Sequence, residues 1–206
     1  ELLFQDAAKK ESSRHDFGRD IIPAMLAGSR VFAYPFRDEN RKQAAYWREA
    51  VEFRNCLLVE QPNGDFGFTI ARQFLFDVYA VVTLDAMSRS SNAELAAIAA
   101  KSLKEAKYHV RHSGEWMLKL GDGTDESHRR VQRGLDELWR FTPELFAADD
   151  VAARLAAQGI GPDLPALRAQ WDTLVRDVVE RATLTVPHDA SHTPHLRGGR
   201  SGMHSE

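Results

Sequence analysis

Residues 66–90 read FGFTIARQFLFDVYAVVTLDAMSRS, and this stretch decides the fold class of the larger part of the chain. Its apolar residues recur at spacings of three and four, which places them along one face of an α-helix. The dipeptide Asn63-Gly64, preceded by Pro62, is a turn signal just upstream of the stretch. The sequence therefore predicts a long helix that begins after a turn and buries Phe66, Ile70, Phe74, Val78 and Val81.

Three further segments downstream show the same helical periodicity: residues 92–120, 126–146 and 164–184. Short, turn-rich stretches such as GDGTD and GIGPD separate them. Helices joined by short connections pack as antiparallel neighbours in a bundle. We therefore predict an all-α helical bundle over residues 50–186.

The two ends of the chain differ from this bundle. Residues 1–49 mix a helical pattern at 16–28 with RVFAYPF at 30–36, whose aromatic and apolar residues favour a short strand. They are predicted to form a short α/β fragment that precedes the bundle. Residues 187–206 are polar and rich in glycine, and we expect a flexible tail.

Composition excludes several classes of function. The 206 residues carry a formal net charge of −3, so no basic field indicates a nucleic acid or an anionic membrane as partner. The single Cys56 excludes an internal disulfide. No apolar run has the length that spans a bilayer, and the start ELLFQDAAKK has no features of a targeting signal. We expect a cytoplasmic protein.

Helical bundles of this kind often hold a di-iron centre through Glu-x-x-His pairs on two helices. The sequence contains no Glu-x-x-His, and the nearest pattern is Glu105 followed by His109, with Lys104 beside them. An ammonium group disfavours a nearby cation, and a second pair is missing. We therefore expect no metal bound by this chain, no catalytic residue and no self-contained active site; Lys104, Glu105 and His109 are interpreted as an ion pair and a half-buried histidine.

From about Val51 onward the chain resembles the C subunit of the bacterial phenylacetyl-CoA epoxidase. The resemblance is carried, in order and with matching gaps, by EFRNCLLVEQPNGDFGFTIARQFLFD, AAIAAKSLKEAKYHVRHSGEWMLKLGDGTDES, LDELWRFTPELF and the closing RSGMHSE. The resemblance implies an incomplete ferritin-like helical bundle, because family members have further helices before and after the matching region. An incomplete bundle is expected to leave apolar faces uncovered.

The same resemblance implies a function and partners. The C subunit is a noncatalytic partner of a di-iron A subunit, which inserts an oxygen atom into the ring of phenylacetyl-CoA during aerobic phenylacetate catabolism. The implied partners are the A subunit and the other subunits of the complex, with phenylacetyl-CoA contacted only indirectly. The di-iron cofactor is expected in the partner and none in this chain, where Lys104, Glu105 and His109 mark a vestigial site.

Residues 1–49 resemble an unrelated family, glucose-1-phosphate adenylyltransferase. SSRHDFGRDIIPAML and RVFAYPFRDENRKQAAYWRE carry this resemblance. The family's motif continues YWRD-V-G-T, and its Asp is associated with the metal and sugar-phosphate site. Here Glu49 takes the place of that Asp, and the nucleotide loop is absent, so the fragment is expected to be inactive.

Two questions remain open at the level of sequence. The first is the loop Glu60, Gln61, Pro62, Asn63, Gly64, Asp65, Phe66, which either faces a partner subunit or is only a turn between helices. The second is what kind of protein the whole chain is. It is either an epoxidase subunit in a chimeric sequence, with a nonfunctional adenylyltransferase fragment fused to it, or an independent di-iron protein with Glu105 and His109 as ligands.

Overall fold

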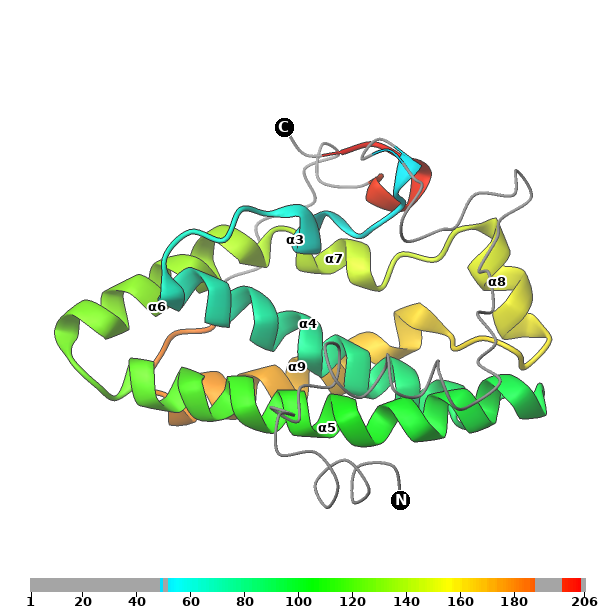
Figure 1. Ribbon diagram of the computed structural model, residues 1–206, viewed down its shortest axis with the longest axis horizontal. Coiled ribbons are helices and arrows are strands. Elements are labelled where there is room, and N and C mark those ends of the chain that lie inside the picture. The colour runs from blue at the N-terminus through cyan, green and yellow to red at the C-terminus, as the bar shows by residue number, and fades with distance from the viewer. Residues whose placement is uncertain (1–48, 50–51, 188–197, 205–206) are drawn as a thin grey trace, which may run out of the picture. The chain divides into compact units, whose positions relative to one another are not determined.

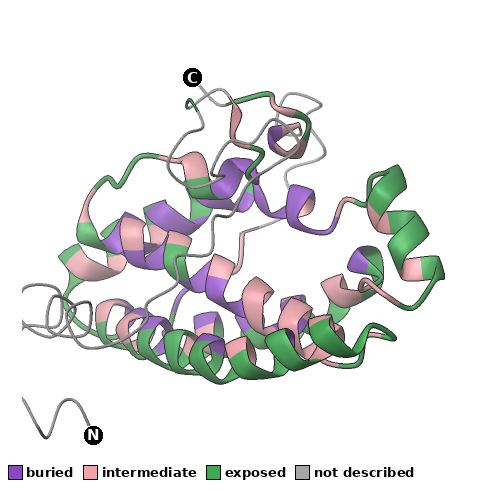
Figure 2. Ribbon diagram, turned by 45° about the vertical axis from the view of Figure 1, so that its right-hand side comes forward, coloured by how far each residue is buried: buried purple, intermediate pink, exposed green. Residues whose placement is uncertain are grey.

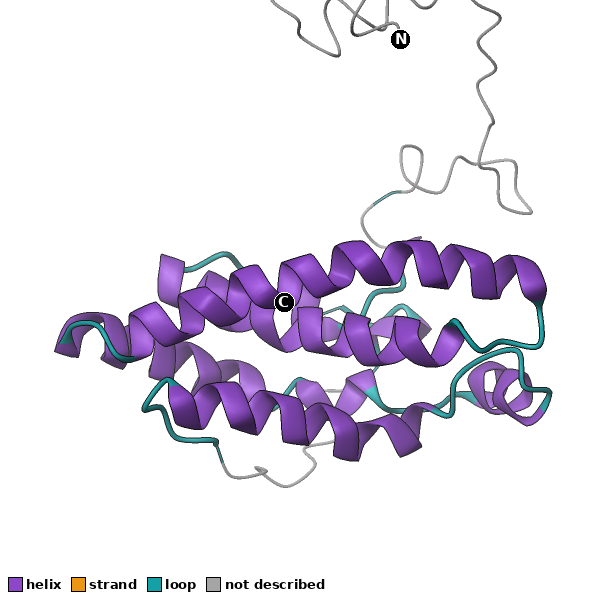
Figure 3. Ribbon diagram, turned by 90° about the horizontal axis from the view of Figure 1, so that it is seen from below, coloured by secondary structure: helices purple, strands orange, loops and turns teal. Residues whose placement is uncertain are grey.

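The larger part of the chain is built from helices in the structure, a computed structural model that describes residues 49, 52–187 and 198–204. The chain divides into two units, Glu1–Ala50 and Val51–Glu206. The predicted α/β fragment lies outside the described residues, apart from Glu49, so that prediction and the predicted domain boundaries stay predictions. Figure 3 shows only helices and loops in the described part, which confirms the all-α prediction there.

The helices are α3 (Leu57–Glu60), α4 (Phe66–Met87), α5 (Ala93–Gly121), α6 (Asp125–Trp139), α7 (Thr142–Leu145), α8 (Asp150–Ala157), α9 (Leu164–Arg181) and the 3-10 turn η4 (Gly199–Ser201). The centre of the bundle is α4, which contacts α3, α5, α6 and α9. Figure 1 shows α5 running back along α4 in the opposite direction.

Side-chain caps set where the long helices begin. The carboxylate of Asp65 accepts a hydrogen bond from the backbone N–H of Phe68 at 2.9 Å, and Asn92 caps α5 in the same way. A capping box between Thr124 and Ser127 starts α6. Each cap gives a partner to a backbone N–H that has none within the helix, so the helix starts at a defined residue.

The core lies around α4 and agrees with most of its predicted apolar face. Ile70, Phe74 and Val78 are buried and Val81 is half-buried, whereas Phe66 at the first turn is 53% exposed. In the described part of the chain, α4 is the one helix that is long and apolar enough to span a membrane. However, 50% of its most apolar 18-residue stretch is buried inside the bundle. An apolar helix surrounded by other helices is the expected core of a bundle.

The predicted helix at 126–146 is interrupted. In the structure α6 ends at Trp139 and α7 begins at Thr142. Pro143 has no N–H to donate to the carbonyl of Trp139, and its ring clashes with a helical carbonyl at that position. The hydroxyl of Thr142 donates to this carbonyl instead, at 2.9 Å. The sequence periodicity continued through the break and concealed it.

One side of α5 is not covered by other described elements. Figure 2 shows exposed residues along much of this helix. Ile98 and Tyr108 are 62% and 58% exposed, while Met117 near its C-terminal end is fully buried. Ile98 and Tyr108 are thus exposed among charged residues such as Lys101, Lys104 and Glu105, and the uncovered apolar face stays a prediction.

Candidate functional site

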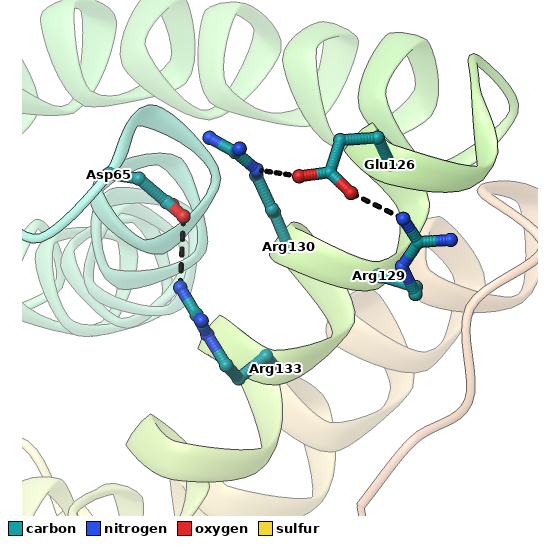
Figure 4. Close-up of a pocket in the computed structure, with 5 residues that line it drawn as sticks. All are labelled: Asp65, Glu126, Arg129, Arg130 and Arg133. Atoms are coloured by element: carbon teal, nitrogen blue, oxygen red, sulfur yellow. Dashed lines mark hydrogen bonds and ion pairs between the residues drawn. The ribbon is translucent and has the colours of Figure 1, made fainter.

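A pocket of about 490 Å³ opens where α4 and α6 begin. Figure 4 shows its lining, in which Asp65 comes from the N-cap of α4 and the other residues from α6. The lining residues are Asp65, Glu126, Arg129, Arg130 and Arg133. Because positions three and four apart share a helix face, α6 brings its arginines to one side of the bundle.

Ion pairs hold these arginines in defined positions. Glu126 accepts from Nε of Arg130 at 2.6 Å and is also paired with Arg129. The hydrogen bond from Arg130, together with that from Arg129, holds the pKa of the Glu126 carboxyl below its usual value. Arg133 donates to Asp65 at 2.9 Å. Figure 4 shows the terminal nitrogens of Arg130 pointing away from Glu126, so the drawn ion pair uses Nε and leaves these donors outside it.

A second, smaller pocket of about 270 Å³ adjoins the first and shares Glu126 and Arg130 with it. Its other lining residues include Phe66, Gly67 and Leu120, which make this part apolar. The ring of Phe66 packs edge-on against Trp116, with centroids 5.0 Å apart. The two pockets together place arginines beside exposed aromatic surface.

The loop from Glu60 to Phe66, for which the sequence left a partner-facing surface and a simple turn as alternatives, leads into this site. Pro62, Asn63 and Gly64 are exposed, Glu60, Gln61 and Asp65 are half-buried, and Phe66 is the first residue of α4. Gly64 has φ of 61°, a left-handed conformation that favours glycine. Arg72 fastens the turn by donating to the carbonyl of Pro62 at 3.0 Å and to Asn63 Oδ1 at 2.7 Å. A turn and a partner surface are compatible here, and the partner role stays a prediction.

The three vestigial-site candidates lie on α5. Lys104, Glu105 and His109 are all exposed, so they do not fill space inside the bundle that the structure describes. The expected half-buried position of His109 is therefore wrong, because no described element covers this side of α5. Within residues 49, 52–187 and 198–204, no group of three or more His, Cys, Asp or Glu is placed to hold a metal ion. The donors present in this part do not fit a di-iron centre, and the vestigial role remains a prediction.

Sequence reasoning did not single out the buried carboxyl group of Asp77. This side chain is 3% exposed and accepts hydrogen bonds from Ser113 Oγ at 2.8 Å and from Gln73 Nε2 at 2.6 Å. Burial raises the pKa of Asp77, although these hydrogen bonds and the nearby His109 and His112 oppose the effect. The spacing of three from Phe74 was the available signal, because it places Asp77 on the apolar face of α4.

We expect Asp77→Asn to stabilise the protein at pH 7 by about 1 kcal/mol. The folded-state pKa of Asp77 is raised, so its contribution to stability is greatest below the unfolded-state pKa and is lost as pH rises toward the folded value. Asparagine keeps an acceptor for Ser113 without the buried charge, and Gln73 can turn its amide to match.

Urea unfolding between pH 4 and pH 7 tests this prediction. The free energy of unfolding of the variant should depend less on pH than that of the parent protein. Asp85→Asn is the control, since Asp85 lies on the same helix as Asp77 but is half-exposed and paired with Arg89. Loss of stability in Asp77→Asn at pH 7 would contradict the predicted penalty of the buried charge.

A second buried carboxylate, Glu144, joins distant parts of the chain. It is 3% exposed and accepts from the backbone N–H of Leu57 at 2.6 Å and from those of Gly198 and Gly199 at 2.8 Å each. Next to it, Arg200 donates to the hydroxyl of Tyr79 at 2.8 Å. The described part of the predicted tail is thus fastened to α3 and α7, while residues 188–197 and 205–206 of that tail lie outside the described residues.

Comparison with known proteins bears out both resemblances. A family model described as "Phenylacetic acid catabolic protein" matches residues 32–206. The C subunit of the 1,2-phenylacetyl-CoA epoxidase of Escherichia coli K12 is 44% identical over 162 residues, which are 79% of this chain and 64% of that protein. The chain therefore spans less than two thirds of the length of this relative.

Short matches to a different family accompany this one. Glucose-1-phosphate adenylyltransferase of Rhodopirellula baltica is 55% identical over 49 residues, 24% of this chain and 11% of that enzyme. The enzyme of Teredinibacter turnerae is 46% identical over 52 residues, again 24% of the chain and 12% of the enzyme. By contrast, the family model and the match to the epoxidase protein cover most of the chain. The chain belongs to the phenylacetic acid catabolic protein family, and its all-α bundle is the ferritin-like fold of that family.

Proposed function

We propose that this chain serves as a noncatalytic structural subunit of a multicomponent phenylacetyl-CoA epoxidase and supports a di-iron catalytic A subunit. The observation that carries the proposal is the 44% identity to the C subunit of the E. coli epoxidase over 79% of the chain. The exposed positions of Glu105 and His109, with Lys104 beside them, support a role in which iron is bound by the partner. Phenylacetyl-CoA would then meet this chain only through the complex, in the cytoplasm.

The proposal requires surfaces for other proteins, and the molecule offers them. Exposed apolar residues on α5 and the loop from Glu60 to Phe66 are available in the described part of the chain. We propose that Lys104, Glu105 and His109 are remnants of a metal site on α5 and that the loop faces a partner.

Co-expression with an epoxidase A subunit tests this function. A tagged chain is expected to retain the A subunit through affinity and size-exclusion chromatography, with iron in the complex and none in stoichiometric amount in the isolated chain. The full-length C subunit of the E. coli epoxidase serves as the positive control. A helical, monodisperse chain that fails to retain the A subunit under conditions where the control succeeds would refute the proposal. Stoichiometric iron in the isolated chain would favour an independent di-iron protein instead.

The start of the chain supports a second, narrower proposal. The adenylyltransferase matches cover 11% and 12% of those enzymes. Glu49 stands where the resemblance places the Asp of the family's motif. Phosphoryl transfer needs nucleotide, metal and phosphate held together. We therefore propose that residues 1–49 are a nonfunctional fragment fused to the epoxidase-like chain.

A further inference from the structure

The surface around the two adjoining pockets combines features that the bundle itself does not require. We call it the arginine–aromatic surface and define it by Phe66, Trp116, Lys119, Arg129, Arg130 and Arg133. Three helices contribute to it: the start of α4, the last turns of α5 and the first turns of α6. It therefore lies where α4, α5 and α6 contact one another.

The apolar part of this surface consists of Phe66, which is exposed, and Trp116, which is half-buried and packs against the core. Phe66 is 53% exposed, although the next residues of its helical stripe, Ile70 and Phe74, are buried. Its ring meets Trp116 edge-on, and the ammonium of Lys119 lies 5.2 Å from the Trp116 ring centroid. Aromatic residues are enriched in protein interfaces, where such exposed rings become buried.

The charged part of this surface consists of three exposed arginines that can bind an anion. The side chains of Arg129, Arg130 and Arg133 are 67%, 52% and 59% exposed. Within the pocket lining, Asp65 and Glu126 supply two negative charges against three positive ones. Just outside the lining, Glu137 lies 3.8 Å from Arg133. Each guanidinium has five N–H donors, and a carboxylate can accept two of them in parallel. A further carboxylate thus finds prepositioned donors and a net positive lining.

The shape favours a protein segment over a small molecule. Pockets for small ligands enclose most of the ligand surface, whereas the arginines lining this pocket are all more than half exposed. Arginine and aromatic residues are enriched in protein interfaces and dominate their binding energy. The loop from Glu60 to Phe66, moreover, ends at Asp65 and Phe66 within the same site.

We propose that the arginine–aromatic surface is a docking site for an acidic segment of a partner protein, in which a carboxylate stands next to an apolar side chain. The carboxylate pairs with Arg130 and Arg133, and the apolar side chain packs against Phe66 and Trp116. This inference rests on the proposed function, since the partner belongs to the proposed complex.

The test measures binding of the whole chain to the purified A subunit at low and at physiological salt. The double substitution Arg130→Glu with Arg133→Glu reverses the charge of the surface and is expected to weaken binding at least about tenfold. The matched control, Arg176→Glu with Arg181→Glu, changes two arginines of α9 with similar exposure and similar pairing at a spacing of four. The control should bind within about twofold of the parent chain.

A second variant keeps the test informative if charge reversal disturbs folding. Phe66→Ala removes a half-exposed ring and should leave the helical circular dichroism unchanged while weakening binding about tenfold. Equal binding by the parent chain, Phe66→Ala and the arginine variant would overturn the docking site while leaving the proposed function in place. Absence of binding by the parent chain would overturn both.

Discussion

Replacing Trp171 with alanine is expected to lower the free energy of unfolding by about 3–5 kcal/mol, among the largest effects of any single substitution in this chain. Trp171 is fully buried, and its ring contacts Trp139 and Phe146 at centroid distances of 5.5 and 5.6 Å. Its indole N–H donates to the carbonyl of Leu75 in α4 at 3.0 Å. Alanine would leave a large cavity between α9, α4 and the residues around α7.

Two further variants separate packing from hydrogen bonding at this position. Trp171→Phe keeps an aromatic ring but removes the N–H donor, so we expect an intermediate loss of stability. Leu174→Ala is the control on the same helix. Because Leu174 is 41% exposed, this substitution should lower the free energy of unfolding by less than about 1 kcal/mol. Chemical unfolding followed by circular dichroism gives all three values. Similar small losses for Trp171→Ala and Leu174→Ala would show that Trp171 does not hold the core together.

Replacing Glu144 with glutamine is the second substitution with a large expected effect, a loss of about 2–4 kcal/mol. The two carboxylate oxygens accept three backbone N–H groups, from Leu57, Gly198 and Gly199. A glutamine amide has one oxygen, so its NH₂ group must face at least one of these donors. A buried donor that loses its acceptor costs about 1–3 kcal/mol, and the charge-assisted character of the original bonds is lost as well.

Hydrogen exchange locates the effect of this substitution in the chain. The amides of Leu57, Gly198 and Gly199 should exchange faster in Glu144→Gln than in the parent protein, whereas amides in the middle of α5 should change less. Glu137→Gln is the control, since the Glu137 side chain is 55% exposed on α6. Unchanged protection of all three amides would show that Glu144 does not fasten the C-terminal segment.

The helices were predictable because the features that form a helix, its cap residues and the spacing of its apolar residues, are local in the sequence. The cap residues Asp65, Asn92 and Thr124 stand directly before α4, α5 and α6, and the apolar spacing of α4 identified Ile70, Phe74 and Val78 as core residues. The break at Pro143 and the short helix α8 were not predicted. Periodicity over a long window masked the break, and the eight residues of α8 contribute no fully buried side chain.

The candidate site was predictable only in part. The loop from Glu60 to Phe66 was singled out by its turn residues, but nothing in the sequence placed it beside the arginines of α6. Asp65 and Arg133 are 68 positions apart, and their ion pair exists only because α4 and α6 begin at the same end of the bundle. The exposure of Lys104, Glu105 and His109 likewise depends on which elements cover α5.

By itself, the sequence determined the helical class, the start of each long helix and the family, because each depends on residues that are near neighbours along the chain or on an ordered series of motifs. The tertiary structure alone decided which carboxylates are buried and which arginines share a pocket. Asp77 meets Ser113 across 36 positions, and Glu144 meets Leu57 across 87. The burial and charge environment of a side chain depend on everything packed around it, and helix packing brings together residues whose separation in sequence carries no sign of their contact.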